Sequence, residues 1–124
     1  LIIKVKDKKG SQLEMSFLEN ELEKILKLKK VDAILWVNEI YAGSALKVLK
    51  KIKIKVPNQI AIISFTDGVI SRYSSPSLST ISQHGEIMGE RAAELLINKL
   101  TGKTNSNEHK TEIINCSLIK RESS

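Results

Sequence analysis

The sequence predicts an α/β fold with a parallel sheet. Short apolar runs that suit strands alternate with longer stretches in which apolar residues recur every three or four positions, as they do in amphipathic helices. The predicted order is strand, helix, strand, helix, strand, loop, helix, strand. Such alternation places helices as crossovers between parallel strands. With 124 residues, the chain has the length of one domain.

Four apolar segments predict the strands. Leu1–Val5 is a short stretch that is followed by turn residues. Ala33–Val37 is a continuous apolar run, which predicts a strand buried on both faces. Ile60–Ile63 is a second run of this kind, and Ile113–Ile119 predicts the last strand.

Three amphipathic stretches predict the helices. The first, Gln12–Lys30, has acidic residues early and basic residues late, an order that suits the helix dipole. The second begins near Ile40, and the third spans about Gln83–Leu100 with Gly102 just beyond it as a C-terminal stop. Residues 66–80, which are rich in serine, predict a long surface loop.

Candidate binding residues follow the predicted strands, because ligands of parallel sheets bind beyond the carboxyl ends of the strands. Asn38 and Glu39 follow one strand, and Phe65, Thr66 and Asp67 follow the next. No Gly-rich phosphate fingerprint follows any strand, so the common kinds of nucleotide binding are not expected.

The composition argues against several other functions. No apolar run approaches the ~18 residues of a membrane span, and no charged leader precedes an apolar segment, so neither membrane insertion nor secretion is expected. One cysteine, Cys116, and two histidines, His84 and His109, give no pattern of metal ligands, and no cofactor is expected. The chain has no Gly-x-Ser-x-Gly elbow and no clustered acid and base residues, so we assign no catalytic residue.

The net charge of +6 comes entirely from residues 1–55. There the lysines alternate with apolar residues, and no arginines cluster. Only 4% of the residues are aromatic, too few to build a base-stacking surface. We therefore expect no direct DNA contact from this chain.

Four stretches resemble the C-terminal part of the lactose-repressor (LacI/GalR) family of bacterial transcription regulators. The match depends on all four occurring in this order and at this spacing. They are Val31–Glu39 with Ala42–Leu46, Ile54–Pro57 with Gln59–Asp67, Pro76–Gln83 with Met88–Gly89 and Ala92–Leu96, and Ser117–Ser123.

The resemblance implies a parallel-sheet, Rossmann-like lobe of a periplasmic-binding-protein-like fold, present as a fragment. In that family, two lobes close on a small molecule, often a sugar, and an upstream helix-turn-helix binds operator DNA. Residues 1–82 would then belong to the C-terminal lobe. Residues 83–111 would be a crossover helix and loop that packs on the N-terminal lobe, which is absent here. Residues 112–124 would return to the C-terminal lobe as the final strand and tail.

The crossover helix would lose its native partner without the N-terminal lobe. We expect its apolar face to be exposed, swapped into another copy or repacked on the C-terminal lobe. That face contains Met88, Ala92, Leu95 and Leu96.

The resemblance implies a cytoplasmic ligand-sensing and dimerising part of a regulator, which is not an enzyme. Its partners would be a sugar-like effector and a second copy, with operator DNA bound only through the upstream domain. Two alternatives remain: a sugar-binding protein of an uptake system, and a fragment of an α/β enzyme.

Each candidate ligand contact also has a purely structural interpretation. Asn38 would face the ligand by resemblance, yet asparagine is equally suited to cap the helix that follows. Glu39 stands where the family usually has Asp, and it fits a helix-start charge better than a ligand contact. Thr66 also replaces a usual Asp, and it offers one hydroxyl and no charge. Asp67 supplies a carboxylate one position later, for a ligand or for a turn.

Three further residues are weaker candidates for the ligand site. Trp36 fits core or lobe-interface packing better than a stacking platform for a ring. Phe65 is open to the same two interpretations. His84 follows the crossover strand near the hinge, as a polar helix start or as a ligand or hinge contact.

The resemblance also implies a dimer face. It would include the helix Tyr41–Lys51 and the loop Arg72–Pro76. For the lysines, a solvated helix face is the alternative. The candidate interface residues are Gly43, Lys47, Arg72, Tyr73, Ser74 and Pro76.

Overall fold

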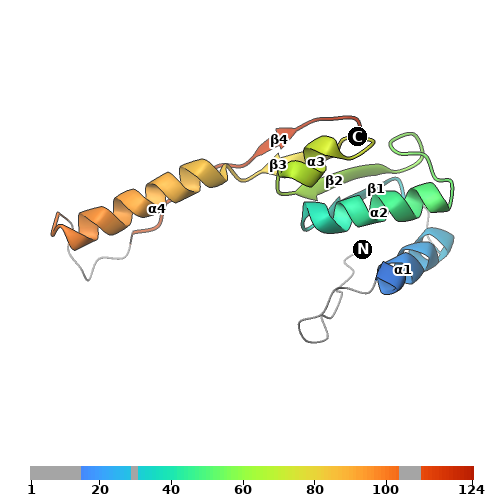
Figure 1. The fold of residues 1–124 in the computed structure, drawn as a ribbon, viewed down its shortest axis with the longest axis horizontal. Coiled ribbons are helices and arrows are strands. Elements are labelled where there is room, and N and C mark those ends of the chain that lie inside the picture. Colours follow the sequence, from blue (N-terminus) through green and yellow to red (C-terminus); the bar gives the residue numbers. More distant parts are fainter. Residues whose placement is uncertain (1–14, 29–30, 104–109) are drawn as a thin grey trace.

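The computed structural model describes residues 15–28, 31–103 and 110–124, and Figure 1 shows their arrangement. The predicted strand Leu1–Val5 lies outside the described residues. The helices and strands, in chain order, are α1 (Met15–Leu28), β1 (Ala33–Trp36), α2 (Glu39–Lys51), β2 (Ala61–Phe65), α3 (Val69–Tyr73), β3 (Ser79–Ser82), α4 (Gly85–Leu100) and β4 (Ser117–Ile119).

The four strands form one mixed sheet in the order β1-β2-β3-β4. β1 pairs with β2 and β2 with β3 in parallel, as the alternation predicts. The prediction is wrong for β4, which is three residues long and antiparallel to β3. The reason is that the chain leaves the sheet through β3, runs out along α4 and returns at the same edge (Figure 1).

The core lies between the sheet and α2. α2 packs on β1 and β2, and α1 packs on α2. The periodicity of α2 is confirmed, because Ala42, Ala45 and Leu49 are fully buried whereas Lys47 is exposed. Full burial of a side chain such as Leu49 stabilises the folded state by about 1.5–3 kcal/mol relative to leaving it exposed. The core residues are Leu22, Ala42, Ala45, Leu46, Val48, Leu49, Ile60, Ile62 and Leu78.

The prediction that Ala33–Val37 is buried on both faces is wrong. Exposure alternates along β1, since Leu35 is 63% exposed while Ile34 and Trp36 pack against the core. Val37, just beyond the strand, is 74% exposed. Side chains of a strand alternate between its faces, and α2 covers only the face of Ile34 and Trp36.

The prediction of a long surface loop over residues 66–80 is only partly right. This segment contains the short helix α3, and it enters β3 at Ser79. Ser71 and Ser79 are fully buried rather than loop residues. Their hydroxyls find partners remote in sequence, because Ser71 donates to Glu39 and Ser79 accepts from the N–H of Arg121.

The C-terminal residues complete the sheet where β2 and β3 begin. Ser123 is fully buried, and its hydroxyl donates to the carbonyl of Ile62 at 2.6 Å. That hydroxyl also accepts from the N–H of Ser79 at 2.8 Å, and the carbonyl of Ser123 accepts from the N–H of Ile62. The tail therefore satisfies backbone groups that two neighbouring strands leave open.

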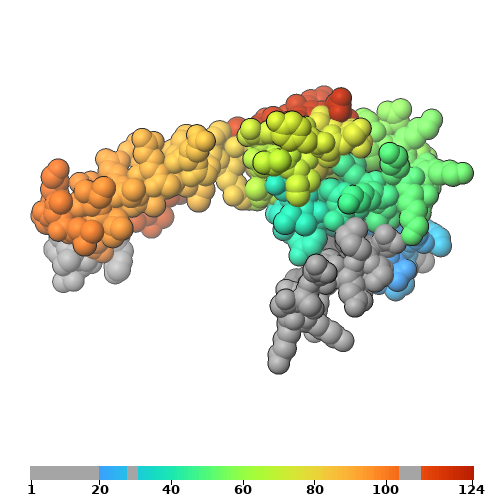
Figure 2. Space-filling model, viewed as in Figure 1, coloured from blue at the N-terminus to red at the C-terminus, as the bar shows by residue number. Residues whose placement is uncertain are grey.

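α4 extends away from the rest of the protein (Figures 1 and 2), and none of its residues is buried. Its exposed apolar side chains include Met88 at 49% and Leu96 at 58%. Gly102 has a φ of 71°, the left-handed conformation expected of a C-terminal stop. Within the described ranges, no helix combines the length and the apolar character that a bilayer span requires.

Candidate functional site

The carboxyl ends of β1, β2 and β3 lie at one edge of the sheet, as parallel pairing requires. Residues 37–39, 65–67 and 82–84 follow or end these strands, and we call them the strand-end edge. The edge brings together the loops of Asn38, Thr66 and His84, which are far apart in the sequence.

Asn38 caps α2. Its backbone is extended, with φ −156° and ψ 167°, and its Oδ1 accepts a hydrogen bond from the N–H of Tyr41 at 3.1 Å. The capping interpretation is therefore confirmed. The cap uses only the amide oxygen, so the Nδ2 donor has no hydrogen-bond partner among the described residues.

Glu39 does more than supply a charge at the start of α2. Its Oε2 accepts hydrogen bonds from the N–H of Gly68 at 3.0 Å, the N–H of Ser71 at 3.0 Å and the hydroxyl of Ser71 at 2.9 Å. Sequence reasoning missed this role, because Glu39 and Ser71 are 32 positions apart and no local pattern connects them.

Thr66 has an unusual backbone conformation, with a φ of 98°. Positive φ strains a β-branched residue, at a cost of about 1–3 kcal/mol. A hydrogen bond holds it there, since its N–H donates to the carbonyl of Ile81 at 3.1 Å. The Ser71 hydroxyl, which donates to Glu39, lies 3.4 Å from the carbonyl oxygen of Thr66. Strain of this kind persists where surrounding contacts impose it, which is common at binding sites.

Asp67 is the centre of a partly buried network of charged and polar side chains. Its side chain is only 8% exposed. Its Oδ1 accepts from Arg121 at 2.6 Å and from the hydroxyl of Thr80 at 2.9 Å, and its Oδ2 accepts from Arg72 at 3.2 Å. Burial raises the pKa of Asp67, but the hydrogen bonds of Arg121 and Thr80 and the charge of Arg121 outweigh it, so the pKa lies below its usual value. Contacts within the chain therefore occupy both oxygens of the Asp67 carboxylate.

Trp36 and Phe65 lie on opposite faces of the sheet. Trp36 packs against the core, and its indole N–H is buried without a partner among the described residues. Phe65 ends β2 on the other face and is half-buried, opposite Ile81 in the register. Of the two, only Phe65 lies on the face that α2 leaves open.

His84 links the two chain segments that leave and re-enter the sheet. It adopts a left-handed conformation with φ 53° at the start of α4. Its Nε2 lies 2.9 Å from the hydroxyl of Ser117, the first residue of β4. Its N–H donates to the hydroxyl of Ser82 at 3.3 Å. His84 therefore lies in the connection between β3 and α4, next to the start of β4.

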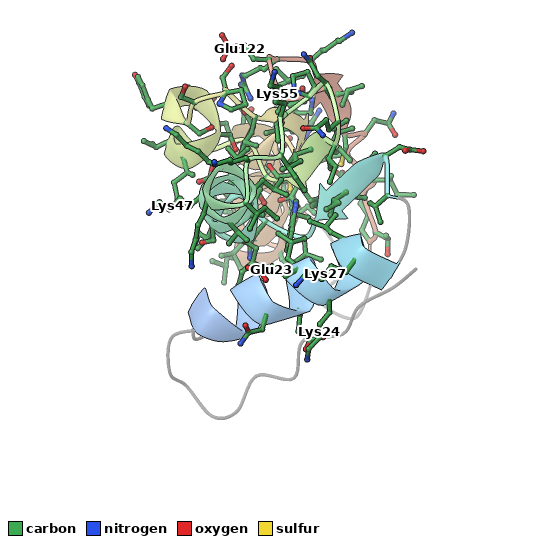
Figure 3. The ribbon with its side chains drawn as sticks, turned by 90° about the vertical axis from the view of Figure 1, so that its right-hand side faces the viewer. Glu23, Lys24, Lys27, Lys47, Lys55 and Glu122 are labelled. Carbon is green, nitrogen blue, oxygen red and sulfur yellow. The ribbon has the colours of Figure 1, made fainter. Side chains whose placement is uncertain are left out.

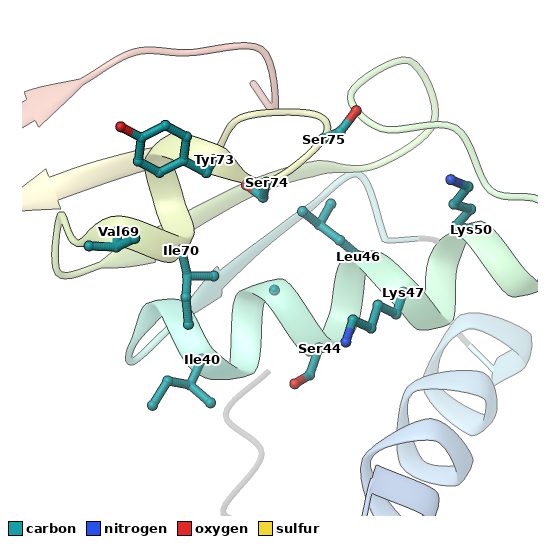
Figure 4. A pocket seen from close by; sticks show the side chains of 11 residues that line it. Ile40, Ser44, Leu46, Lys47, Lys50, Val69, Ile70, Tyr73, Ser74 and Ser75 are labelled. Carbon is teal, nitrogen blue, oxygen red and sulfur yellow. The ribbon is translucent and has the colours of Figure 1, made fainter.

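A second surface feature is an open groove of about 650 Å³ between α2 and α3 (Figure 4). Its apolar wall is exposed, with Ile40 at 61%, Val69 at 71% and Tyr73 at 84%. A Cβ on Gly43 would lie 2.9 Å from Cγ2 of Ile70, so the absence of a side chain lets α3 approach α2. The lining residues are Ile40, Gly43, Ser44, Leu46, Lys47, Lys50, Val69, Ile70, Tyr73, Ser74 and Ser75.

The groove contains four of the six candidate interface residues, namely Gly43, Lys47, Tyr73 and Ser74. Lys47 projects outward from α2 (Figure 3). Arg72 is not among the lining residues and pairs with Asp67, and Pro76 follows the groove through a cis peptide bond. Within the described part of the chain, no three His, Cys, Asp or Glu side chains gather in a group that could hold a metal ion.

Comparison with known proteins identifies the family of this chain. Residues 4–124 match the family described as periplasmic binding protein-like domain. The HTH-type transcriptional regulator CelR of Thermobifida fusca is 30% identical over 74 residues, which are 60% of this chain and 22% of the relative. The HTH-type transcriptional regulator MalR of Clostridium butyricum is 31% identical over 105 residues, which are 85% of this chain and 30% of the relative.

A solved structure extends the likeness to the fold. The CelR–cellobiose complex superimposes with a TM-score of 0.78 at 25% identity, over 90% of this chain and 34% of that one. The chain thus spans about a third or less of these regulators. By sequence and by fold, the chain belongs to the periplasmic-binding-protein-like domains, as part of the effector-binding domain of the LacI/GalR regulators.

Proposed function

We propose that the chain is the ligand-sensing and dimerisation part of a LacI-type transcription regulator. A small-molecule effector, a sugar or a related metabolite, binds between two lobes and changes operator binding by an upstream helix-turn-helix. The convergence of Asn38, Thr66 and His84 at one edge of the sheet carries this proposal. Such regulation requires the effector to contact two lobe arrangements unequally.

The strand-end edge suits a neutral, hydroxyl-rich ligand. The Asn38 amide donor has no partner among the residues that the structure describes, and Thr66 contributes a hydroxyl at a strained position. The carboxylates of Glu39 and Asp67 are occupied by contacts within the chain, so they support the site rather than bind the effector. The cellobiose of the CelR complex gives a chemical precedent for the ligand class.

The other candidate residues have lesser roles in this proposal. Phe65 gives the edge an apolar surface, and His84 contacts the ligand or the hinge. Trp36 belongs to the core rather than to the ligand site, because its ring packs against the core residues.

The groove between α2 and α3 is the proposed contact with a second copy. Its exposed apolar side chains, such as Val69 and Tyr73, favour association in water. Gly43, Lys47, Tyr73 and Ser74 would take part directly. Arg72 and Pro76 would act through the placement of α3 and of the chain that follows it.

In this proposal, residues 83–111 would pack on an N-terminal lobe, while residues 1–82 and 112–124 would belong to the C-terminal lobe. The support for this division is that α4 leaves the remainder of the protein and buries none of its own residues (Figure 2). An amphipathic helix whose apolar face has no packing partner is unstable in isolation, so α4 needs a second body.

We infer that the protein acts in the cytoplasm, where operator DNA lies, and that it is a binding module rather than an enzyme. The curated relatives CelR and MalR are transcriptional regulators, which favours this function over an uptake protein or an enzyme fragment.

A thermal-shift screen of the intact protein tests the proposal. Cellobiose and a panel of other sugars are added in turn, and the melting temperature is measured. A sugar at about 100 times its Kd adds about 2.7 kcal/mol of stability, which raises the melting temperature by several degrees. N38A and T66A should reduce the shift, whereas K24A, a change to an exposed side chain of α1, should not.

The same sugar should change retention of operator DNA in a gel-shift assay. If no sugar changes either the melting temperature or the DNA affinity of the folded protein, the proposed function is wrong.

A further inference from the structure

Glu39, the first residue of α2, caps the start of α3. Gly68 is the N-cap residue of α3 and offers no capping side chain. Instead, Oε2 of Glu39 accepts the N–H groups of Gly68 and Ser71, both at 3.0 Å. Glu39 thus supplies from another helix the acceptor that an Asp or Ser N-cap usually provides locally.

Glu39 fits this place because residue 68 has no side chain. A Cβ on Gly68 would overlap the Glu39 carboxyl group and would lie 2.6 Å from its Cδ. The φ of Gly68 is −116°, which other residues also adopt, so any need for glycine here comes from this overlap, which a side chain could relieve only by displacing the Glu39 carboxyl group. Glu39 and Gly68 therefore form a matched pair.

This contact connects the two surfaces described above. Glu39 directly follows Asn38 at the strand-end edge. The helix that Glu39 caps presents Val69, Ile70 and Tyr73 to the groove. α3 is thereby held at two points, by Glu39 at its start and by the close approach of Ile70 to Gly43.

We propose that Glu39 is a positioning residue that sets the place of α3 against α2 and transmits changes at the strand-end edge to the groove. A shift of Asn38 moves Glu39 through the backbone, and Glu39 moves the N-terminus of α3 through its hydrogen bonds. The identity of the two surfaces rests on the proposed function, but the placement of α3 by Glu39 does not.

Hydrogen exchange of the intact protein tests the placement without any ligand. In E39A, the amides of Gly68 and Ser71 lose a charged acceptor, so their exchange should accelerate about tenfold to a hundredfold. E39Q keeps an acceptor oxygen and should fall between E39A and the wild type. K24A removes a surface ion pair on α1 and should leave these amides unchanged. If both amides exchange at the wild-type rate in E39A, the proposal is wrong.

A double-mutant cycle tests the matched pair. G68A should lower the melting temperature, because its methyl group meets the Glu39 carboxylate. E39D shortens the side chain and removes this overlap, so E39D/G68A should melt above G68A alone. Additive effects of the two changes would show that the residues are not matched.

Sedimentation of the intact protein tests the transmission to the groove. E39A should raise the dimer dissociation constant about tenfold, E39Q should restore most of the affinity, and K24A should have no effect. If E39A dimerises like the wild type, Glu39 does not position the groove. If even the wild type forms no dimer, the dimer proposal fails, while hydrogen exchange still decides the role of Glu39 in placing α3.

Discussion

Replacing Asp67 with alanine should destabilise the lobe strongly. The change removes the charge partner of Arg121, which is only 18% exposed, and the acceptor of the Thr80 hydroxyl. Breaking a buried ion pair by removing one partner costs about 3–5 kcal/mol. We expect about 3 kcal/mol, because Arg121 keeps its hydrogen bond to the carbonyl of Leu78 at 2.8 Å. The contact with Arg72 adds little, since that side chain is 61% exposed.

Urea unfolding of the intact protein, followed by the fluorescence of Trp36 and by circular dichroism, measures this loss. A cost of this size corresponds to a fall in melting temperature on the order of 10 °C. K24A is the control, because it breaks the 2.8 Å pair with Glu21 at a site where the Lys24 side chain is 65% exposed. That pair should contribute less than about 1 kcal/mol. If D67A and K24A have equal effects, the network around Asp67 does not stabilise the fold as the geometry implies.

Three further predictions concern the same region. T66G should raise the melting temperature, because glycine adopts the φ of 98° without the strain of a β-branched residue; a lower melting temperature would mean that Thr66 makes contacts worth more than its strain. In G43A, the 2.9 Å contact with Ile70 opposes the gain of about 1 kcal/mol in helix propensity, so calorimetry should show that G43A stabilises I70A more than it stabilises the wild type; an equal effect in both backgrounds would place the clash elsewhere. The lowered pKa of Asp67 in the folded protein contributes stability above pH 3.8, the ordinary pKa of the group, and this stability is lost as the pH falls through the folded-state pKa. The urea midpoint of unfolding should therefore decline more steeply below pH 3.8 in the wild type than in D67N. Equal declines in both proteins would contradict the pKa shift.

The elements of the fold were predictable where the signal is periodic and local. The apolar spacing of α2 places Ala42, Ala45 and Leu49 in the core, and Gly102 ends α4 with the expected left-handed conformation. The exposure of Leu35 was not predictable, because an apolar strand carries no mark of which of its faces a given set of helices covers.

The candidate site was predictable in position but not in chemistry. The order of the strands located Asn38 and Thr66 at one edge. The sequence did not reveal that Asp67 pairs with Arg121 or that Glu39 caps α3, because each contact joins residues that are tens of positions apart. The sequence predicts a loop at Ser71 and Ser79 for the same reason, because their hydrogen-bond partners, Glu39 and Arg121, come from distant parts of the chain.

The paired segments at His84 and Ser117 have a mechanical consequence. A single connecting segment would leave the orientation of α4 free about several axes. Here two neighbouring segments connect α4 to the sheet, and Nε2 of His84 lies 2.9 Å from Oγ of Ser117. Rotation of α4 about the line through His84 and Ser117 keeps the length of both segments, whereas rotation within the plane of the sheet would stretch one of them. Two connections thus favour one axis of rotation between α4 and the sheet, whether or not a ligand is bound.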